Sequence, residues 1–356
     1  MAKNIVVFSD GTGQEGGKGV NSNIYKLFNV IEDRTSKQIS FYDRGLGTGW
    51  WRKVGALIGG AGISKNIKDC YRFIFENFEA GDQIYLFGFS RGAATVRSLS
   101  SFIHYFGILP QSRPELIDKA YAIYEIENEA ERQEEADAFI ELHHTMWTKI
   151  HFLGCFDTVT ALGVPWKPVD VILNKFRFFH HKFHNFQLSE AVENAYHALA
   201  IDDEREHFQP VLFDPKILPG QEVEQVWFCG MHSDVGGGYE EDQLSNIPLA
   251  WMLDRAKKRG LIIYDDKKRG ISKDVDGQTL FPGDVNGMMH NSREGWGKLD
   301  PKKKRSWRKS RSDKPIVHPS VWERTKNSNN EDNPPYQPWI SKSDSEVWTE
   351  SDEVGK

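Results

Sequence analysis

One serine stands where its hydroxyl can become a nucleophile. Ser90 is the centre of the pentapeptide Gly88-Phe89-Ser90-Arg91-Gly92, which follows the apolar run 83–87 and precedes a helix-like segment. A Gly-x-Ser-x-Gly motif between a strand and a helix holds the serine on a sharp, strained turn with its Oγ exposed. Gly88 and Gly92 let the strand and the helix approach without a Cβ clash. The motif therefore predicts Ser90 as the attacking group of a covalent reaction.

A serine hydroxyl is a weak nucleophile until a histidine takes its proton, and that histidine needs a carboxylate to orient it. On a strand–turn–helix scaffold of this kind the chain order is Ser, then Asp or Glu, then His, with the later members just after strands. Asp157 follows the apolar run 150–156, and His232 follows the run 226–231. We therefore predict a catalytic triad of Ser90, Asp157 and His232.

Three other carboxylates remain alternatives to Asp157: Asp202, Asp234 and Asp254. Asp234 lies only two residues after His232, so we expect it to brace that loop through backbone N–H groups instead.

Acyl transfer also needs donors for the oxyanion that forms on the substrate. The backbone N–H of Arg91 is one predicted donor. The second is expected from the glycine-containing loop after the first strand, at Gly11 or Thr12, with Asp10 bracing that loop. Loss of one such donor typically lowers the rate by about 100- to 1000-fold.

The composition narrows the class of protein. The 356 residues are 39% hydrophobic, with a net charge of -6, which argues against a dedicated nucleic-acid binder. The three cysteines lie in apolar stretches and are expected to be reduced core residues. The first apolar run ends at Ser9, too short for a signal peptide, so we expect a chain that is cytoplasmic as synthesised. No metal or cofactor is predicted, because the histidines at 180, 181 and 184 lack a suitably spaced Cys or carboxylate.

Short apolar runs alternate with helical patterns along the chain, which is typical of a mainly parallel sheet covered on both faces. The predicted strands are 4–8, 38–42, 83–89, 150–156 and 224–229, and the predicted helices are 24–31, 67–78, 93–106, 190–200 and 248–258. We expect one domain over 1–340 with insertions at 107–148 and 164–187. Irregular structure should wrap the domain beyond about residue 265, and 341–356 should be a flexible tail.

Three segments carry chemistry that the triad does not use. The aromatic and basic segment 166–186 is either an interfacial lid or a core-packing excursion. Seven of the ten residues 302–311 are Lys or Arg, which would contact anionic headgroups or form a solvated basic face. The glycine-punctuated apolar segment 54–63 is either a flap over an acyl pocket or a buried turn.

The order of motifs along the chain resembles a known family. The motifs are 8–12, 42–48, Gly88–Ala93, 156–159, His197–Arg205, His232–Tyr239 and 318–321. They are similar to those of the GFSRG-type serine hydrolases, a family that includes type VI secretion lipase effectors, which are antibacterial phospholipases. The resemblance implies an α/β-hydrolase-like catalytic domain, and the family's triad falls on Ser90, Asp157 and His232. The characterised effectors are longer, so this chain is expected to be little more than the catalytic domain.

The resemblance and the residues together predict a serine ester hydrolase of lipase or phospholipase type. The alternatives are an acyl hydrolase acting on peptide, thioester or carbohydrate esters, and a non-catalytic binding protein on a hydrolase scaffold. The expected partners are an acyl-ester or phospholipid substrate and a membrane surface contacted peripherally, with no nucleic acid. A secretion or immunity partner, and export by a signal-independent system, are implied by the resemblance alone.

Overall fold

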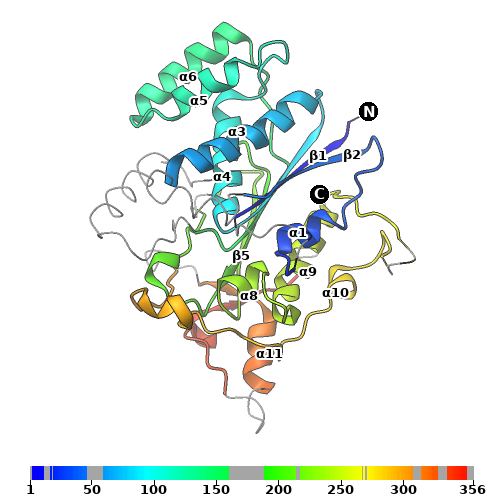
Figure 1. The fold of residues 1–356 in the computed structure, drawn as a ribbon, viewed down its shortest axis with the longest axis vertical. Helices are drawn as coiled ribbons and strands as arrows, with labels where there is room; N and C mark the ends of the chain where they lie inside the picture. The colour runs from blue at the N-terminus through cyan, green and yellow to red at the C-terminus, as the bar shows by residue number, and fades with distance from the viewer. Residues whose placement is uncertain are drawn as a thin grey trace.

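The structure is a computed structural model, in which eight strands form one sheet with helices packed on it (Figure 1). It describes residues 2–11, 17, 19–45, 59–159, 188–213, 217–266, 268, 271–307, 314–327 and 335–350. The predicted lid segment 166–186 and residues 54–58 of the predicted flap lie outside these ranges, whereas 59–63 begin helix α3 (Gly59–Asn77).

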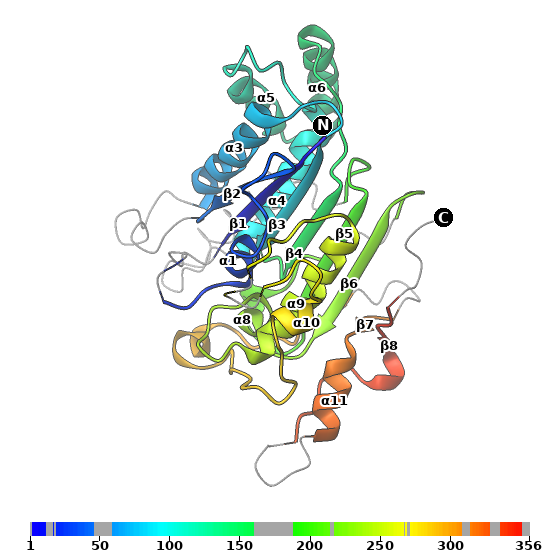
Figure 2. The same cartoon turned by 90° about the vertical axis from the view of Figure 1, so that its right-hand side faces the viewer.

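Every neighbouring pair of strands in the sheet is parallel, in the order β2-β1-β3-β4-β5-β6-β7-β8 (Figure 2). The strands are β1 (Asn4–Asp10), β2 (Gln38–Asp43), β3 (Gln83–Phe89), β4 (Phe152–Phe156), β5 (Asn194–Ala200), β6 (Glu222–Phe228), β7 (Ile316–Val317) and β8 (Glu346–Val347). The α/β-hydrolase-like architecture predicted from the sequence, a parallel sheet with helices, is confirmed.

Helices cover both faces of this sheet. One face packs against α3 and α4 (Arg91–Phe106), and the other against α1 (Asn23–Phe28) and α9 (Gln243–Lys258) (Figure 2). The other α-helices of the described residues are α5 (Leu116–Tyr124), α6 (Glu129–His143), α8 (His232–Gly236), α10 (Gly277–Leu280) and α11 (Pro319–Asn327).

The core follows from the two-residue period of the strands. In β1, Val6 and Phe8 join one buried cluster, whereas Ile5 and Val7 join the cluster on the opposite face. Successive side chains of a strand point to opposite faces, so a strand buried on both faces has a continuous apolar sequence. The sheet is therefore the wall between two hydrophobic cores.

The strand order fixes where the chemistry lies. The chain leaves β1 toward β2 on one side, and it re-enters the sheet at β3 on the other side of β1. Ligands of open α/β sheets bind at the carboxyl ends of the strands, at such a switch point. Gly11 follows β1 and Ser90 follows β3, so both lie at this point.

The segment 190–200 is a wrong prediction of the sequence analysis. It was expected to be a helix, but residues 194–200 form β5, which pairs with β4 and β6 and is buried along its whole length. Alanine favours helix, and a strand buried on both faces shows no alternation of polar and apolar residues. Burial in the middle of the sheet overrides the helical propensity of Ala195, Ala198 and Ala200.

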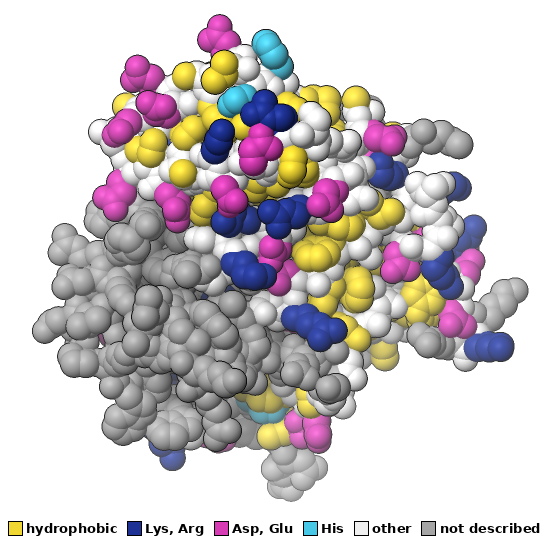
Figure 3. Space-filling view, turned by 45° about the horizontal axis from the view of Figure 1, so that its top comes forward, with side chains coloured by type: hydrophobic (Ala, Val, Ile, Leu, Met, Phe, Trp, Pro, Cys, Tyr) yellow, Lys and Arg dark blue, Asp and Glu magenta, His cyan; other side chains and the backbone are white. Residues whose placement is uncertain are grey.

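The first insertion, expected at 107–148, is helical. Residues 107–148 contain α5 and α6, which form one end of the molecule (Figure 1). Figure 3 shows acidic side chains gathered at this end beside apolar ones, and α6 contributes exposed Glu129, Glu131, Glu134, Glu135 and Asp137. This charge makes the α5–α6 end a poor surface for anionic lipid.

The prediction of a flexible tail needs correction for residues 341–350. Residues 346–347 form β8, which pairs with β7, and the indole Nε1 of Trp348 donates to Glu224 over 2.8 Å. Glu350 pairs with Arg255 and Lys258 of α9. The polar sequence does not reveal these contacts because their partners lie 30 positions away in β7 and more than ninety positions away in β6 and α9. Residues 351–356 lie outside the described part of the chain.

Gly92 provides a test of how tightly the sheet edge is packed. A Cβ at Gly92 would overlap the carbonyl oxygen of Ser9 at the end of β1. We expect Gly92→Ala to lower the free energy of unfolding by about 1–3 kcal/mol, measured by urea denaturation. In an uncrowded helix the same change would raise stability by up to about 1 kcal/mol. A variant as stable as the parent would therefore contradict the close approach.

Candidate active site

Ser90 lies on the turn between β3 and α4 in a strained backbone conformation. Its φ is 59° and its ψ is -121°, values that non-glycine residues rarely adopt. The backbone N–H of Ser90 donates to the carbonyl of Phe156 over 3.0 Å, which ties the turn to the end of β4. A Cβ at Gly88 would lie 2.5 Å from the carbonyl oxygen of Gly92, so the turn requires glycine there. The serine is thus held in the elbow geometry that the motif predicts.

His232 reaches Ser90 from the first residue of α8, shortly after β6. Its Nε2 lies 2.8 Å from Ser90 Oγ. The imidazole ring packs against the rings of Phe89 and Phe208, with centroid distances of 4.7 and 5.4 Å. Its backbone N–H donates to Asp203 Oδ2 over 3.3 Å. The imidazole is therefore buried and oriented on several sides.

Asp157 completes the hydrogen-bonded chain from the end of β4. Its Oδ2 lies 2.5 Å from His232 Nδ1, and its Oδ1 accepts the backbone N–H of Ala200 over 3.0 Å. The residue has a φ of 40°, a left-handed conformation that aspartate tolerates better than most residues. The structure thus brings together the three side chains predicted from strand ends, although they are as much as 142 positions apart.

Arg305 is a member of the site that the sequence analysis missed. Its Nη1 donates to Asp157 Oδ1 over 2.5 Å, and its Nη2 donates to Asp157 Oδ2 over 2.8 Å. Its side chain is fully buried. The run 302–311 was expected to contact headgroups or to be a solvated face, and for Arg305 both expectations are wrong. The flanking residues 302–304 are exposed, so no pattern in the sequence separates Arg305 from them.

The electrostatics of the site follow from these contacts. Burial alone would raise the pKa of Asp157, but Arg305 and His232 overcome it and hold the pKa well below its usual value. Burial lowers the pKa of His232, and Arg305 acts in the same direction, whereas the carboxylates of Asp157 and Asp203 oppose the shift. The resting site therefore holds an ionised Asp157 beside a neutral His232 at neutral pH.

The loop after β1 lies directly against the elbow. A Cβ at Gly11 would lie 2.6 Å from the backbone nitrogens of Arg91 and Gly92, and the Arg91 side chain donates through Nε to the Gly11 carbonyl over 3.1 Å. Asp10 accepts hydrogen bonds from Ser22 and, over 3.0 Å, from Tyr42. Thr12, the other predicted donor, lies outside the described residues.

None of the three alternative carboxylates forms a hydrogen bond with His232. Asp234 accepts the backbone N–H groups of Met231 and His290, each over 3.0 Å, so it braces the loop. Asp202 accepts from Gly230 and Tyr336, and Asp254 accepts from Gly277.

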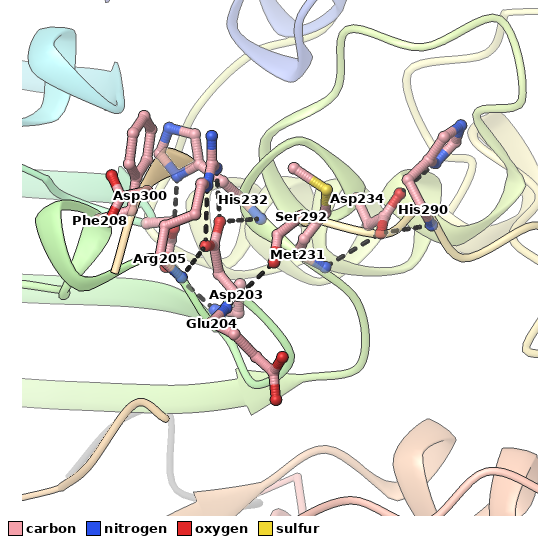
Figure 4. Close-up of polar contacts among 12 residues, drawn as sticks. Asp203, Glu204, Arg205, Phe208, Met231, His232, Asp234, His290, Ser292 and Asp300 are labelled. Carbon is pink, nitrogen blue, oxygen red and sulfur yellow. Dashed lines mark hydrogen bonds and ion pairs between the residues drawn. The ribbon is translucent and has the colours of Figure 1, made fainter. Parts of the chain in front are cut away.

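Two further charged residues, Asp203 and Arg205, form a hydrogen-bonded group with the backbone of His232 (Figure 4). Asp203 sits between the backbone of His232 and the side chain of Arg205, whose Nε donates to Asp203 Oδ1 over 3.0 Å. The Arg205 guanidinium stacks on the ring of Phe208, 3.4 Å from its centroid. These residues follow β5, so the strand-end reasoning that selected Asp157 would have found them had β5 not been read as a helix.

His197 binds the backbone of the residue that follows Asp157. It lies in β5, is fully buried, and its Nε2 accepts the backbone N–H of Thr158 over 3.1 Å. Burial lowers its pKa to about 3, with Arg97 acting in the same direction. The histidine is therefore neutral and holds the turn that starts at Asp157.

The part of the chain that the structure describes contains no cluster of His, Cys, Asp and Glu able to hold a metal ion. None of its described helices is both long and apolar enough to span a membrane. Cys70, Cys155 and Cys229 are buried free thiols, and burial raises the pKa of each.

Comparison with known families places the chain. The catalytic-domain family of the type VI secretion system (T6SS) phospholipase effectors of Tle1-like type matches residues 3–255. The match covers well over half of the 356 residues, and the chain belongs to this family.

Three individual proteins are also similar to this chain. An uncharacterized protein of Saccharomyces cerevisiae is 30% identical over 319 residues, covering 82% of this chain and 43% of that protein. This chain thus spans less than half the length of that relative. A crystal structure of an uncharacterized protein from Pseudomonas aeruginosa shows 15% identity and a TM-score of 0.48, covering 80% of this chain and 49% of its own. The Tle1 effector bound to the VgrG spike of the type 6 secretion system shows 20% identity and a TM-score of 0.36, covering 68% and 52%.

The buried His197 predicts an acid-sensitive fold. An unfolded histidine protonates near pH 6.5, whereas the folded one stays neutral down to about pH 3. The unfolded state binds more protons between these values, so stability falls as the pH drops through that window. We expect the loss attributable to His197 to be about 3 kcal/mol at pH 4 and to vanish in His197→Gln, measured by urea denaturation at pH 7 and pH 4.

Thr158→Val is the matched control for this experiment, because it removes the hydroxyl that contacts His197 but leaves the imidazole buried. It should keep the parental pH dependence. An unchanged dependence in His197→Gln would show that another group causes the acid sensitivity.

Proposed function

We propose that the protein is a serine ester hydrolase of lipase or phospholipase type that works through Ser90, His232 and Asp157 and a covalent acyl-enzyme. The observation that carries the proposal is the continuous hydrogen-bonded chain from Ser90 Oγ through both ring nitrogens of His232 to Asp157 Oδ2. The strained elbow at Ser90 and the family membership support it.

In the first half of the reaction, Ser90 Oγ attacks the ester carbonyl while His232 Nε2 takes the hydroxyl proton. Asp157 stabilises the imidazolium through Nδ1–H. The tetrahedral intermediate then expels the alcohol, which receives the proton from Nε2, and Ser90 is left acylated. In the second half, water loses a proton to Nε2 and attacks the acyl carbonyl, and the carboxylic acid leaves as Ser90 recovers its proton.

The oxyanion of both intermediates would be bound by the backbone N–H of Arg91 and by a donor from Gly11 or Thr12. The closeness of Gly11 to the backbone nitrogens of Arg91 and Gly92 supports this placement. Gly88 and Gly92 let the elbow form, and Asp10 and Asp234 hold the two loops that flank it.

The proposed substrate is the acyl ester of a phospholipid, reached by peripheral contact with the membrane surface. The family description, which names phospholipase effectors, supports this substrate class and export by a signal-independent secretion system. A secretion or immunity partner is the corresponding proposal for a macromolecular contact.

Ser90→Ala tests the nucleophile. We expect it to lower ester hydrolysis by at least about 1000-fold and to leave the thermal unfolding temperature close to that of the parent. The assay is a panel of short esters, lysolipids and diacyl phospholipids, together with labelling by a fluorophosphonate probe. Phospholipids turned over faster than short esters would support the lipid substrate.

Ser101→Ala is the matched control, since Ser101 is a buried serine of α4, the helix that follows Ser90. It should retain both activity and labelling. Full turnover by Ser90→Ala, or a probe adduct on another residue of the parent, would remove Ser90 from the mechanism.

Asp157→Asn tests the carboxylate. An amide cannot stabilise the imidazolium and favours the wrong tautomer, so we expect kcat to fall by about 10,000-fold. The control is Asp202→Asn, a change at one of the alternative carboxylates, whose burial raises its pKa to about 6. That variant should stay within about tenfold of the parent. The reverse ranking of the two variants would identify Asp202 as the orienting carboxylate.

A further inference from the structure

We infer that Arg305 is a positioning residue of the proposed triad, which fixes the carboxylate of Asp157 through a two-point ion pair and sets the charge balance around His232. The inference rests on the proposed function, because the triad is what Arg305 would position. The hydrogen bonds and ion pairs of Arg305 go to Asp157, Asp203 and the backbone and not to Ser90 or His232, so it acts through Asp157.

Arg305 binds both oxygens of the Asp157 carboxylate. Each terminal nitrogen of Arg305 binds one oxygen of Asp157, and each also binds a backbone carbonyl, Nη1 that of Ala200 over 2.9 Å and Nη2 that of Phe208 over 2.7 Å. A planar guanidinium that binds a carboxylate at two points fixes its orientation as well as its charge. The carboxylate can therefore present Oδ2 to His232 in one orientation only.

The segment that carries Arg305 is itself fastened to the end of β5. Lys303 donates its backbone N–H to Glu204 over 2.8 Å, and Glu206 donates to Pro301 over 2.9 Å. Trp307 stacks on Trp339 at a centroid distance of 5.0 Å. Arg305 lies fifty residues beyond the end of the family match at residue 255. The positioning residue thus lies outside the matched residues 3–255.

The charges that face His232 are balanced. Asp157 and Asp203 supply two negative charges and Arg305 one positive charge, while Arg205 supplies the second positive charge as the ion-pair partner of Asp203. Without Arg305 the buried site would carry a net negative charge when His232 is neutral, which is costly in a medium of low dielectric constant. The same positive charge disfavours the imidazolium, so removing it should make His232 more basic.

Two substitutions separate the geometry of Arg305 from its charge. Arg305→Lys keeps the charge but loses the two-point fork, so kcat/KM should fall by about 100-fold with the acid limb of its pH profile in place. Arg305→Gln loses the charge as well, so the acid limb should move to higher pH by about one unit. Rates are normalised to active sites titrated with a fluorophosphonate, which removes the contribution of unfolded protein.

A second measurement does not depend on turnover. In Ser90→Ala protein the imidazole nitrogens of His232 can be titrated by NMR, and adding Arg305→Gln should raise the pKa read from that titration. Arg255→Gln is the matched control. Arg255 lies on α9 and is also a buried arginine, and it pairs with the carboxylates of Glu224 and Glu350. It should lower stability and leave both pH profiles unchanged.

The outcomes are distinct. A parent protein that no fluorophosphonate labels would overturn the proposed function. A labelled parent whose Arg305 variants keep the parental kcat/KM and pH profile would overturn the inference alone, since Arg305 would then be a structural counter-ion. Should Arg305→Gln not fold, Arg305→Lys decides, because an unaltered kcat/KM in that variant excludes positioning.

Discussion

The burial of one carboxylate constrains the whole site. The side chain of Asp157 has no exposed surface, and an isolated charge in such a place would be neutralised or expelled. It stays ionised because Arg305, Ala200 and His232 all meet it. These partners come from the end of β5, the start of α8 and a segment far beyond both, so the requirement of one charge holds distant parts of the chain together.

The same edge of the sheet stores the strain of the elbow. Ser90 has a φ of 59°, a conformation that costs on the order of 1–3 kcal/mol and persists only where the surroundings fix it. Here the surroundings are backbone. The end of β1 packs so closely on the elbow that Gly11 and Gly92 have no room for a Cβ, and the first turn of α4 leaves none at Gly88. Parallel strands make this possible, since they bring their carboxyl ends to a common edge. The strain at Ser90 and the charge at Asp157 are thus supported by one architecture.

The sequence predicts those parts of the site that depend on a local pattern of residues. Ser90, Asp157 and His232 each follow an apolar run, and the structure places them within hydrogen-bonding distance in a chain. Strand β5 was not predicted, because its alanines favour helix and its burial on both faces removes the alternation of polar and apolar residues. That error hid Asp203 and Arg205 at its end. Arg305 was not predicted for another reason. Its neighbours at 302–304 are exposed lysines, and only its tertiary contacts distinguish it from them.

The position of Arg305 bears on what a catalytic domain of this family contains. The match to the family ends at residue 255, within α9, yet the cation that keeps Asp157 ionised is residue 305. A fold that buries this carboxylate must supply a positive charge or several N–H donors to it, whatever segment provides them. Relatives that differ in the region after α9 must therefore meet the same demand with another cation or leave their carboxylate closer to water. The electrostatic unit extends beyond the residues that the family model matches, because charge pairing is a property of the folded site.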